Sequence, residues 1–565
     1  MQTEVLNKEI IPALASSGIV YVSHENFDSR QEHFVQSLFN EEIFPLLTPL
    51  RADSSQPFSL ITNLKLHGAF LLKPLVEDSS LPKEFLSKEE EPLVIVQIPN
   101  TIRRVIWLPS NDEKKYFTLV DDIIVKFVTK LFPGYNVTES LIFKATCDAD
   151  FSVEEDNEDF IQAMESVLVQ RDFAKPVRLV CNTTSSRIQK MLTEKLELLS
   201  EDVYSVDGIV DISTLTDLWS IEGFSDLKFP SWKKSSVKGI KTGKPFWDKI
   251  KQEDILLHVP YQKYEPVLQF INDAADDPNV LAIKMTLYRT SEHSAITAAL
   301  ERAARNGKQV TVFVELKARF DEKQNISWAA RLEKAGAIVV YGIVNLKVHG
   351  KVLLVVRRES SGVRRYVHFS TGNYNEKTAN LYSDISIFTA DSEIANDITL
   401  FFNMISGYSA IQTMNRMFMA PINLKSKLLS MIEREIQNSS PEKPGLIMAK
   451  MNSLVDEDCI KALYKASANN VKVLLNVRGI CMLVPEKKGL SENIKVVSII
   501  DRFLEHSRVF YFQNGGNEEI YLSSADWMPR NLERRVEIML PIVQENIFKD
   551  IKENLQIYFS DTENS

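Results

Sequence analysis

From about residue 236 onward, short apolar runs alternate with segments that have helical periodicity. The run 280–287 is typical of a buried strand. The segment after it has apolar residues at helical spacing, namely Ile296, Ala299, Leu300 and Ala303. Gly307 ends this predicted helix, and the apolar run 310–316 predicts the next strand. Strands that alternate with helices in this way indicate an α/β fold.

The same order of elements returns in the last third of the chain. Strands are predicted over 446–451 and 471–477, with a helix between them. Two pairs of cationic residues fall on matching strands, Lys284 with Lys450 and Lys317 with Arg478. This weak internal repeat predicts two similar α/β domains.

The residues before the repeat mix strands and helices. The runs 68–72 and 93–98 are strand-like, and 219–243 is a linker rich in Pro, Lys, Ser and Gly. We therefore expect a multidomain α/β protein with four parts. These are a residual helix of an N-terminal domain at 1–20, a mixed α/β domain at 21–235, and the two similar α/β domains at 236–416 and 417–565.

Composition limits the kinds of partner and the cellular location that we expect for this protein. The chain has 565 residues, enough for several domains, and its net charge of −10 argues against a general nucleic-acid-binding protein. No apolar run approaches the roughly 18 residues of a membrane span, so we expect no transmembrane segment, while peripheral membrane association stays open. Four scattered cysteines without a CxxC pair indicate reduced thiols and a cytoplasmic location.

One predicted strand pair concentrates positive charge in this acidic chain. His349 and Lys351 stand two residues apart, just before the apolar run 352–356, so both side chains project from one face of a strand. Between 343 and 367, six lysines and arginines accompany a single acid. The polar loop 370–374 then offers hydroxyl, amide and backbone N–H groups. These features predict an oxyanion site with a nucleophile in it.

A lone histidine on a strand is more often structural than catalytic, but this motif recurs. The matching parts are His349-x-Lys351 with His506-x-Arg508, and the loop 370–373 with the loop 523–526. Because the matches come in the same order in both repeats, we expect the two histidines to face a shared cleft.

The chemistry that these residues favour is phosphoryl transfer, with His349 as nucleophile. Neutral imidazole attacks phosphorus readily, and the transfer needs mainly positioning and stabilisation of charge on the phosphoryl oxygens. His506 could hand a proton to the leaving oxygen, because the unperturbed pKa of histidine lies near working pH. Six cationic residues are candidates to stabilise the phosphates: Lys317, Lys347, Lys351, Arg289, Arg319 and Arg478.

Paired His-x-Lys/Arg strands also resemble the phospholipase D superfamily, whose motif is H-x-K-x-x-x-x-D. The aspartate position of that motif holds Val356 in the first half and Gln513 in the second. This departure counts against a phosphodiesterase and favours a relative with altered chemistry.

Longer stretches of the sequence resemble polyphosphate kinases of the first type. The similar blocks include DILLHVPY (254–261), AIKMTLYRT (282–290), STGNYNEKTANLYSD (370–384), DRFLEHSRVFYF (501–512) and YLSSADWMPRNLERRVEIMLPI (521–542). Weaker similarity, as in 44–53, extends almost to the start of the chain. The resemblance implies two phospholipase D-like C-terminal domains and reversible transfer of the terminal phosphate of ATP to inorganic polyphosphate.

The resemblance also implies roles for single residues. His349 matches the histidine that is phosphorylated in the family, and His506 matches its second active-site histidine. Tyr382 and Arg478, together with His506, match residues that bind the nucleotide.

The resemblance further implies Mg²⁺ as cofactor and a homo-oligomer that binds ATP or ADP and polyphosphate. Arg289 and Arg319 match positions that the family associates with magnesium. Because arginine is no ordinary metal ligand, we expect these two side chains to bind phosphates beside the ion.

Three departures from the family pattern bear on function. The family begins with a helical domain carrying an asparagine that helps to hold ATP, and this sequence is expected to start at the last helix of that domain, which would weaken nucleotide binding. Gly350 stands where alanine is usual, and we expect it to loosen the strand beside His349. Cys147 stands in place of an arginine, which removes one charge from the N-terminal half.

Two other functions remain alternatives. A phospholipase D-like phosphodiesterase would hydrolyse a phosphodiester substrate without ATP. A non-catalytic polyphosphate-binding protein would bind the polymer without being labelled by the γ-phosphate of ATP.

Overall fold

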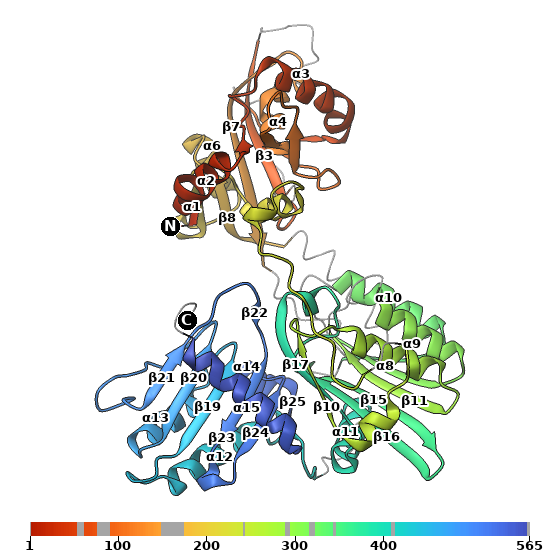
Figure 1. Cartoon of the computed structure of the whole chain (residues 1–565). Coiled ribbons are helices and arrows are strands. Elements are labelled where there is room, and N and C mark those ends of the chain that lie inside the picture. The colour runs from red at the N-terminus through yellow and green to blue at the C-terminus, as the bar shows by residue number, and fades with distance from the viewer. Residues whose placement is uncertain are drawn as a thin grey trace. The chain divides into compact units, whose positions relative to one another are not determined.

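The computed structural model of the chain contains two compact units, Met1–Pro230 and Ser231–Ser565 (Figure 1). The structure describes residues 2–52, 61–75, 91–148, 174–240, 243–288, 294–315, 322–342, 346–407 and 413–561. Both units combine strands with helices, which confirms the predicted multidomain α/β class. Of the helices in these ranges, not one has the length together with the apolar character that a bilayer span requires.

The first unit is built on two sheets. A three-stranded sheet has the order β1-β6-β5, and a six-stranded sheet has the order β2-β4-β3-β7-β8-β9. Their strands are β1 (Ile19–Tyr21), β2 (Pro49–Arg51), β3 (Leu66–Pro74), β4 (Leu93–Gln97), β5 (Val105–Leu108), β6 (Lys115–Leu119), β7 (Tyr135–Cys147), β8 (Pro176–Asn182) and β9 (Val203–Val206). The strands predicted at 68–72 and 93–98 are thus confirmed as β3 and β4.

The described helices of the first unit are α1 (Gln2–Val5), α2 (Ile11–Ser16), α3 (Ser29–Leu38), α4 (Val120–Phe127) and α6 (Ser186–Lys195). The two longest of these helices have N-cap side chains. The Asp28 carboxylate accepts hydrogen bonds from two backbone amides at the start of α3, and the Ser185 hydroxyl accepts one from a backbone amide at the start of α6. Val35 of α3 then packs against Phe70 and Val96 of the large sheet in one core.

The second unit contains two eight-stranded sheets of the same design. Seven strands of the first sheet have the order β10-β17-β16-β15-β11-β12-β13, and its eighth, β22, pairs with β17. Seven strands of the second have the order β18-β25-β24-β23-β19-β20-β21, and its eighth, β14, also pairs with β25. The strands of the first half are β10 (Ile255–Val259), β11 (Val280–Leu287), β12 (Gln309–Val314), β13 (Ile338–Tyr341), β14 (Lys347–Val348), β15 (Lys351–Glu359), β16 (Gly362–Ser370) and β17 (Tyr382–Thr389). Those of the second half are β18 (Phe418–Ala420), β19 (Leu446–Met451), β20 (Lys472–Val477), β21 (Ile494–Val497), β22 (Leu504–Glu505), β23 (Arg508–Phe512), β24 (Glu519–Ser523) and β25 (Arg535–Pro541).

Nine described helices accompany these sheets. They are α7 (Trp247–Gln252), α8 (Glu265–Asp276), α9 (Ala295–Arg305), α10 (Glu322–Lys334), α11 (Ser392–Ser406), α12 (Leu424–Asn438), α13 (Glu457–Ala468), α14 (Pro529–Arg534) and α15 (Glu545–Ser560). Strand for strand, the two sheets follow one order, so the predicted internal repeat is confirmed. The strands predicted at 280–287, 310–316, 446–451 and 471–477 are β11, β12, β19 and β20.

The two halves exchange one short strand each. β14 belongs to the first half by sequence but pairs with β25 of the second. β22 belongs to the second half but pairs with β17 of the first. His349 follows β14 directly, and His506 follows β22. Each histidine therefore belongs to one half by sequence but lies beside the sheet of the other half.

Strand pairing fixes which residues of the two halves correspond. Lys351 opposes Ser370 in one half and Arg508 opposes Ser523 in the other, so the two cations are equivalent, as the sequence predicted. The match of Lys284 with Lys450 shifts by two residues, and the match of Lys317 with Arg478 stays a prediction because Lys317 lies outside the described residues.

Lys284 and Lys450 lie on corresponding strands but not at corresponding positions. Lys450 opposes Val509, the equivalent of Val352, whereas Lys284 opposes Leu354. The residue that corresponds to Lys450 is therefore Thr286, whose hydroxyl accepts a hydrogen bond from the amide of Val352 at 3.0 Å. A repeat matched by residue type alone cannot resolve such a shift, because a displacement of two keeps a side chain on the same face.

One hydrophobic core joins the two halves. Val352 and Leu354 of the first sheet share a buried cluster with Ile538 and Leu540 of the second, and α11 and α15 contribute to it. Burial of apolar side chains is the main favourable term in folding, so the halves should depend on each other for stability.

We expect Leu540→Ala to lower the free energy of unfolding by about 2–5 kcal/mol, since Leu540 is 2% exposed in this shared core. The loss of stability should affect both sheets of the second unit, because they share this core. Hydrogen exchange of the full chain would measure it, with faster exchange expected in β15 as well as in β25. Faster exchange confined to the second half would contradict a shared core.

Candidate active site

The backbone at His349 is held by the opposite half of the second unit. The amides of His349 and Gly350 both donate hydrogen bonds to the carbonyl of Val536 in β25, at 2.9 and 3.0 Å. The imidazole is 10% exposed and meets the ring of Tyr288 edge-on, with ring centres 5.1 Å apart. The position of this side chain is therefore closely defined.

Glu537 orients the imidazole of His349. Its Oε2 lies 2.9 Å from Nδ1 of His349, and its carboxylate also accepts hydrogen bonds from the Ser524 hydroxyl at 2.5 Å and the Asn531 amide at 2.6 Å. A carboxylate surrounded by donors favours a proton on Nδ1 of the histidine. Nε2 then keeps its lone pair.

The surroundings also keep His349 uncharged. Burial lowers the pKa of His349 well below its ordinary value, and the positive charges of Lys351, Arg535 and Arg508 lower it further. The imidazole is therefore neutral at physiological pH, which is the state in which its free nitrogen is nucleophilic.

His506 is arranged in the same way by the other sheet. Its amide donates a hydrogen bond to the carbonyl of Ser383 at 3.1 Å, and its Nδ1 lies 2.9 Å from both carboxylate oxygens of Asp384. The Thr371 hydroxyl donates a hydrogen bond to Asp384 at 2.7 Å. Burial disfavours the charged carboxylate, but His506, Thr371 and Arg508 outweigh it and lower the pKa of Asp384.

Arg508 links the two histidines electrostatically. Its guanidinium donates two hydrogen bonds to Asp526, at 3.2 and 3.0 Å, and one to the carbonyl of His506 at 2.9 Å. Its Nη1 also lies 3.1 Å from Nε2 of His506. Burial lowers the pKa of both His349 and His506, and the charge of Arg508 adds to this at each. One buried cation thus acts on both imidazoles.

Two lysines flank His349. Lys351 is 2% exposed, and its ammonium group donates a hydrogen bond to the carbonyl of His349. Burial lowers the pKa of Lys351 well below its ordinary value, although Glu537 opposes the shift. The ammonium groups of Lys347 and Lys351 each lie 5.6 Å from the ring centre of Tyr288.

Tyr382 and Arg478 lie beside His506. The ring of Tyr382 is centred 5.3 Å from the imidazole. Nε of Arg478 donates a hydrogen bond to Asn452 at 2.5 Å, and the Asn452 amide in turn donates to the carbonyl of His506 at 3.2 Å. Both side chains are half-buried, so part of each is available to a ligand.

The structure brings together six residues that the sequence singled out: His349, His506, Lys347, Lys351, Tyr382 and Arg478. The remaining three, Arg289, Arg319 and Lys317, lie outside the described residues. Within the described ranges, no cluster of three or more His, Cys, Asp or Glu side chains could hold a metal ion.

Sequence reasoning missed the two carboxylates that orient the histidines. A signal for them exists in the repeat, because Thr371 and Asp384 are 13 residues apart and Ser524 and Glu537 are also 13 residues apart. In both pairs a hydroxyl from the polar loop donates to the acid. The two carboxylates could have been predicted from this equal spacing, because the intervals between the other motifs of the repeat differ between the two halves.

Gly350 is tightly packed, which contradicts the expectation of a loosened strand. A Cβ built at this position would lie 2.8 Å from Cδ1 and 3.0 Å from Cγ1 of Ile538, which is fully buried. The space that an alanine methyl group would need is therefore filled by the isoleucine.

Comparison with known proteins identifies the family of this chain. Models of the polyphosphate kinase middle domain, C-terminal domain 1 and C-terminal domain 2 match residues 30–218, 245–411 and 417–565. The polyphosphate kinase of Halalkalibacterium halodurans is 42% identical over 99% of this chain and 79% of its own length. That of Bacillus anthracis is 42% identical over 98% of this chain and 78% of its own length. The chain belongs to the polyphosphate kinase family.

A solved structure of the family shares the fold. The crystal structure of polyphosphate kinase from Porphyromonas gingivalis matches 99% of this chain and 82% of its own, with a TM-score of 0.83 and 31% identity. The predicted family and fold class are thus confirmed. The domain boundaries expected at residues 20, 235 and 416 stay predictions.

In this member of the polyphosphate kinase family, we expect Glu537→Gln to lower the rate of phosphoryl transfer by about 10- to 100-fold, the scale typical of losing a carboxylate that orients a functional histidine. The amide can present its NH₂ to Nδ1 and favour the wrong tautomer. Steady-state kinetics would measure the loss. Glu519→Gln, which removes a half-buried carboxylate of the same half that is paired with Arg434, should leave the rate within about twofold. Equal rates for both variants would contradict the orienting role.

The lowered pKa of His349 predicts resistance of the nucleophile to mild acid. A histidine with the ordinary pKa of about 6.5 is roughly three-quarters protonated at pH 6.0, whereas a group with a depressed pKa stays neutral until the pH falls to that lower value. The initial rate of labelling by γ-labelled ATP at saturating nucleotide should therefore change less than about twofold between pH 7.5 and pH 6.0. A fall of about fourfold that follows the curve of a free imidazole would refute this.

Proposed function

We propose that this chain transfers the terminal phosphate of ATP reversibly to inorganic polyphosphate through a phosphohistidine at His349. The observation that carries the proposal is a neutral, nearly buried imidazole whose Nδ1 contacts Glu537 and whose Nε2 is left to attack. Membership of the polyphosphate kinase family supports the same activity.

In the first step, the Nε2 lone pair of His349 forms a bond to the γ-phosphorus as the bond from phosphorus to the bridging oxygen of ADP breaks. ADP leaves with the electron pair of that bond. The imidazole gains positive charge, which the Nδ1–H hydrogen bond to Glu537 stabilises.

In the second step, a terminal phosphate oxygen of polyphosphate attacks the phosphoryl group. The N–P bond breaks, its electron pair returns to Nε2, and the polymer is one phosphate longer. Both steps run backward when ADP and polyphosphate are in excess. Lys317, Lys347 and Lys351 are proposed to bind the phosphate groups during these steps.

The nucleotide is proposed to bind at His506, Tyr382 and Arg478. Nε2 of His506 lies 3.1 Å from Nη1 of Arg508, so a phosphate that draws this guanidinium away would free Nε2 to exchange a proton with the leaving or attacking oxygen. Arg508 itself would then stabilise charge on that phosphate.

Mg²⁺ is proposed to accompany the nucleotide. Bound through phosphate oxygens, it would supply neutralisation of negative charge. Arg289 and Arg319 are proposed to bind phosphates beside the ion, because arginine is always protonated and carries no lone pair for a metal. A homo-oligomer, a cytoplasmic location and peripheral membrane association stay predictions.

The test is labelling with γ-labelled ATP and magnesium. We expect an acid-labile, base-stable phosphoamino acid that peptide mapping places at His349. His349→Ala should abolish labelling and turnover in both directions, and His506→Ala should lower turnover by about 10²-fold or more.

His33→Ala provides the matched control, because His33 is an exposed histidine of the first unit. It should keep full labelling and turnover. Turnover retained by His349→Ala would place the nucleophile elsewhere, and hydrolysis of a phosphodiester without ATP would point to the phosphodiesterase alternative.

A further inference from the structure

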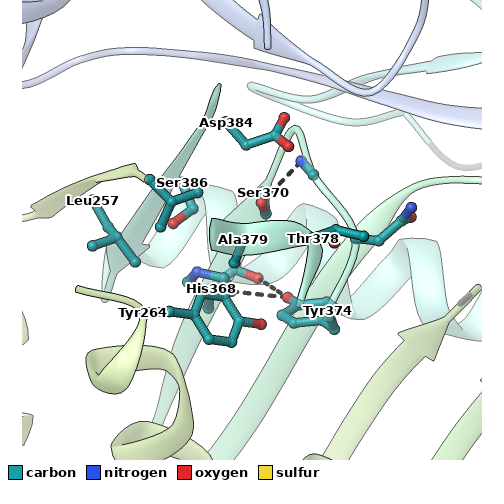
Figure 2. Close-up of a pocket in the computed structure, with 12 residues that line it drawn as sticks. Leu257, Tyr264, His368, Ser370, Tyr374, Thr378, Ala379, Asp384 and Ser386 are labelled. Carbon is teal, nitrogen blue, oxygen red and sulfur yellow. Dashed lines mark hydrogen bonds between the residues drawn. The ribbon is translucent and has the colours of Figure 1, made fainter. Parts of the chain in front are cut away.

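A small, partly enclosed cavity is lined by residues of the polar loop of the first half. It measures about 10 Å³, and Figure 2 shows its lining. The lining residues used below are Tyr264, His368, Asn373, Tyr374 and Asp384. By size it accommodates one water molecule, for which about 10–15 Å³ suffices.

Three polar atoms of this lining have no hydrogen-bond partner among the described residues. They are Nε2 of His368, Oδ1 of Asn373 and the hydroxyl of Tyr264. His368 is only 1% exposed. An unpaired buried polar atom costs about 1–3 kcal/mol, and all three residues line this one cavity, which favours a partner held inside it.

The protonation states of these atoms are complementary to water. Burial lowers the pKa of His368 to about 3 and raises the pKa of Tyr264 above its ordinary value, so the imidazole is neutral and the phenol keeps its proton. The Tyr374 hydroxyl donates to the carbonyl of His368 at 3.2 Å and lies 2.9 Å from its Nδ1 (Figure 2). A hydroxyl that gives its only proton to the carbonyl must accept from Nδ1–H, and Nε2 is then an acceptor.

The cavity therefore presents two acceptors, His368 Nε2 and Asn373 Oδ1, and one donor, the Tyr264 hydroxyl. We propose that it binds one ordered water molecule, which donates a hydrogen bond to each acceptor and accepts one from Tyr264. Three hydrogen bonds are what a buried water typically makes.

This water would be a positioning element for His506. Asp384, which orients His506, borders the same cavity, and it accepts a hydrogen bond from the hydroxyl of Thr371 in the polar loop at 2.7 Å. A Cβ built on Gly372 of that loop would lie 2.2 Å from Oδ2 of Asp384, so the carboxylate occupies the space beside the loop backbone that a side chain would need. By linking Asn373 in the loop to His368 in β16, the water would hold the loop at its present distance.

The direct test is a crystal structure of the full chain at a resolution that shows ordered waters. We expect a single density peak at hydrogen-bond distance, about 2.7–3.2 Å, from His368 Nε2, Asn373 Oδ1 and the Tyr264 oxygen. An empty cavity, or side chains that close on one another without a water, would overturn the proposal. This result does not depend on the proposed function.

The second test uses Tyr264→Phe, which removes the donor and keeps the ring. We expect the peak to weaken or vanish, Asp384 to shift relative to His506, and kcat to fall about 3- to 10-fold with KM for ATP within about twofold. Tyr366→Phe is the matched control, because Tyr366 is a buried tyrosine of the same strand as His368 whose hydroxyl contacts Glu359 at 2.6 Å.

Tyr366→Phe should keep kcat while losing comparable thermal stability. Equal kcat for the two variants, with Asp384 unmoved in Tyr264→Phe, would show that the cavity does not position His506. If neither variant nor wild type has transferase activity, the proposed function fails, while the density and the position of Asp384 still decide the water site.

Discussion

The active arrangement depends on the exchange of two short strands between the sheets of the second unit. β14 and β22 are two residues long, and each ends at a histidine. By crossing to the other sheet, each strand brings its imidazole to the carboxylate of the opposite half, Glu537 for His349 and Asp384 for His506. Neither histidine would have a fixed tautomer without the opposite half. The catalytic geometry therefore depends on the association of the two halves.

The two halves have kept this frame while their chemistry has diverged. Both hold the polar loop by the same kind of hydrogen bond: the Gly372 amide donates to the Ser370 hydroxyl and the Ala525 amide donates to the Ser523 hydroxyl, both at 3.0 Å. At the cation position, however, Lys351 turns back to a carbonyl, whereas Arg508 is fixed by two hydrogen bonds to Asp526. Asn373 occupies the place of Asp526 and leaves the first half without that carboxylate. This difference favours a nucleophilic role for His349, whereas His506 lies beside the guanidinium of Arg508.

Much of this frame could be predicted from the sequence, because periodicity and order survive divergence. The strands β11, β12, β19 and β20 and the paired His-x-Lys/Arg motifs were all visible as local patterns. The partners of the histidines were not, since Glu537 lies 188 residues from His349 and Asp384 lies 122 residues from His506. An acidic residue on a strand shows no sequence pattern that marks it as the partner of a histidine. The exchanged strands also bring together residues that are too far apart in the sequence for any local pattern to connect. The shift between Lys284 and Lys450 was hidden for a related reason, as strand register is set by pairing.

The long separation between His349 and Glu537 also has a consequence for biosynthesis. At about 5–20 residues per second, the ribosome adds the intervening 188 residues in roughly 10–40 s. Throughout that interval the emerging nucleophile has no carboxylate to set its tautomer and no second sheet to exclude water. A nascent chain that has not yet reached residue 537 is therefore inert, and competence arrives only after Glu537 has been added.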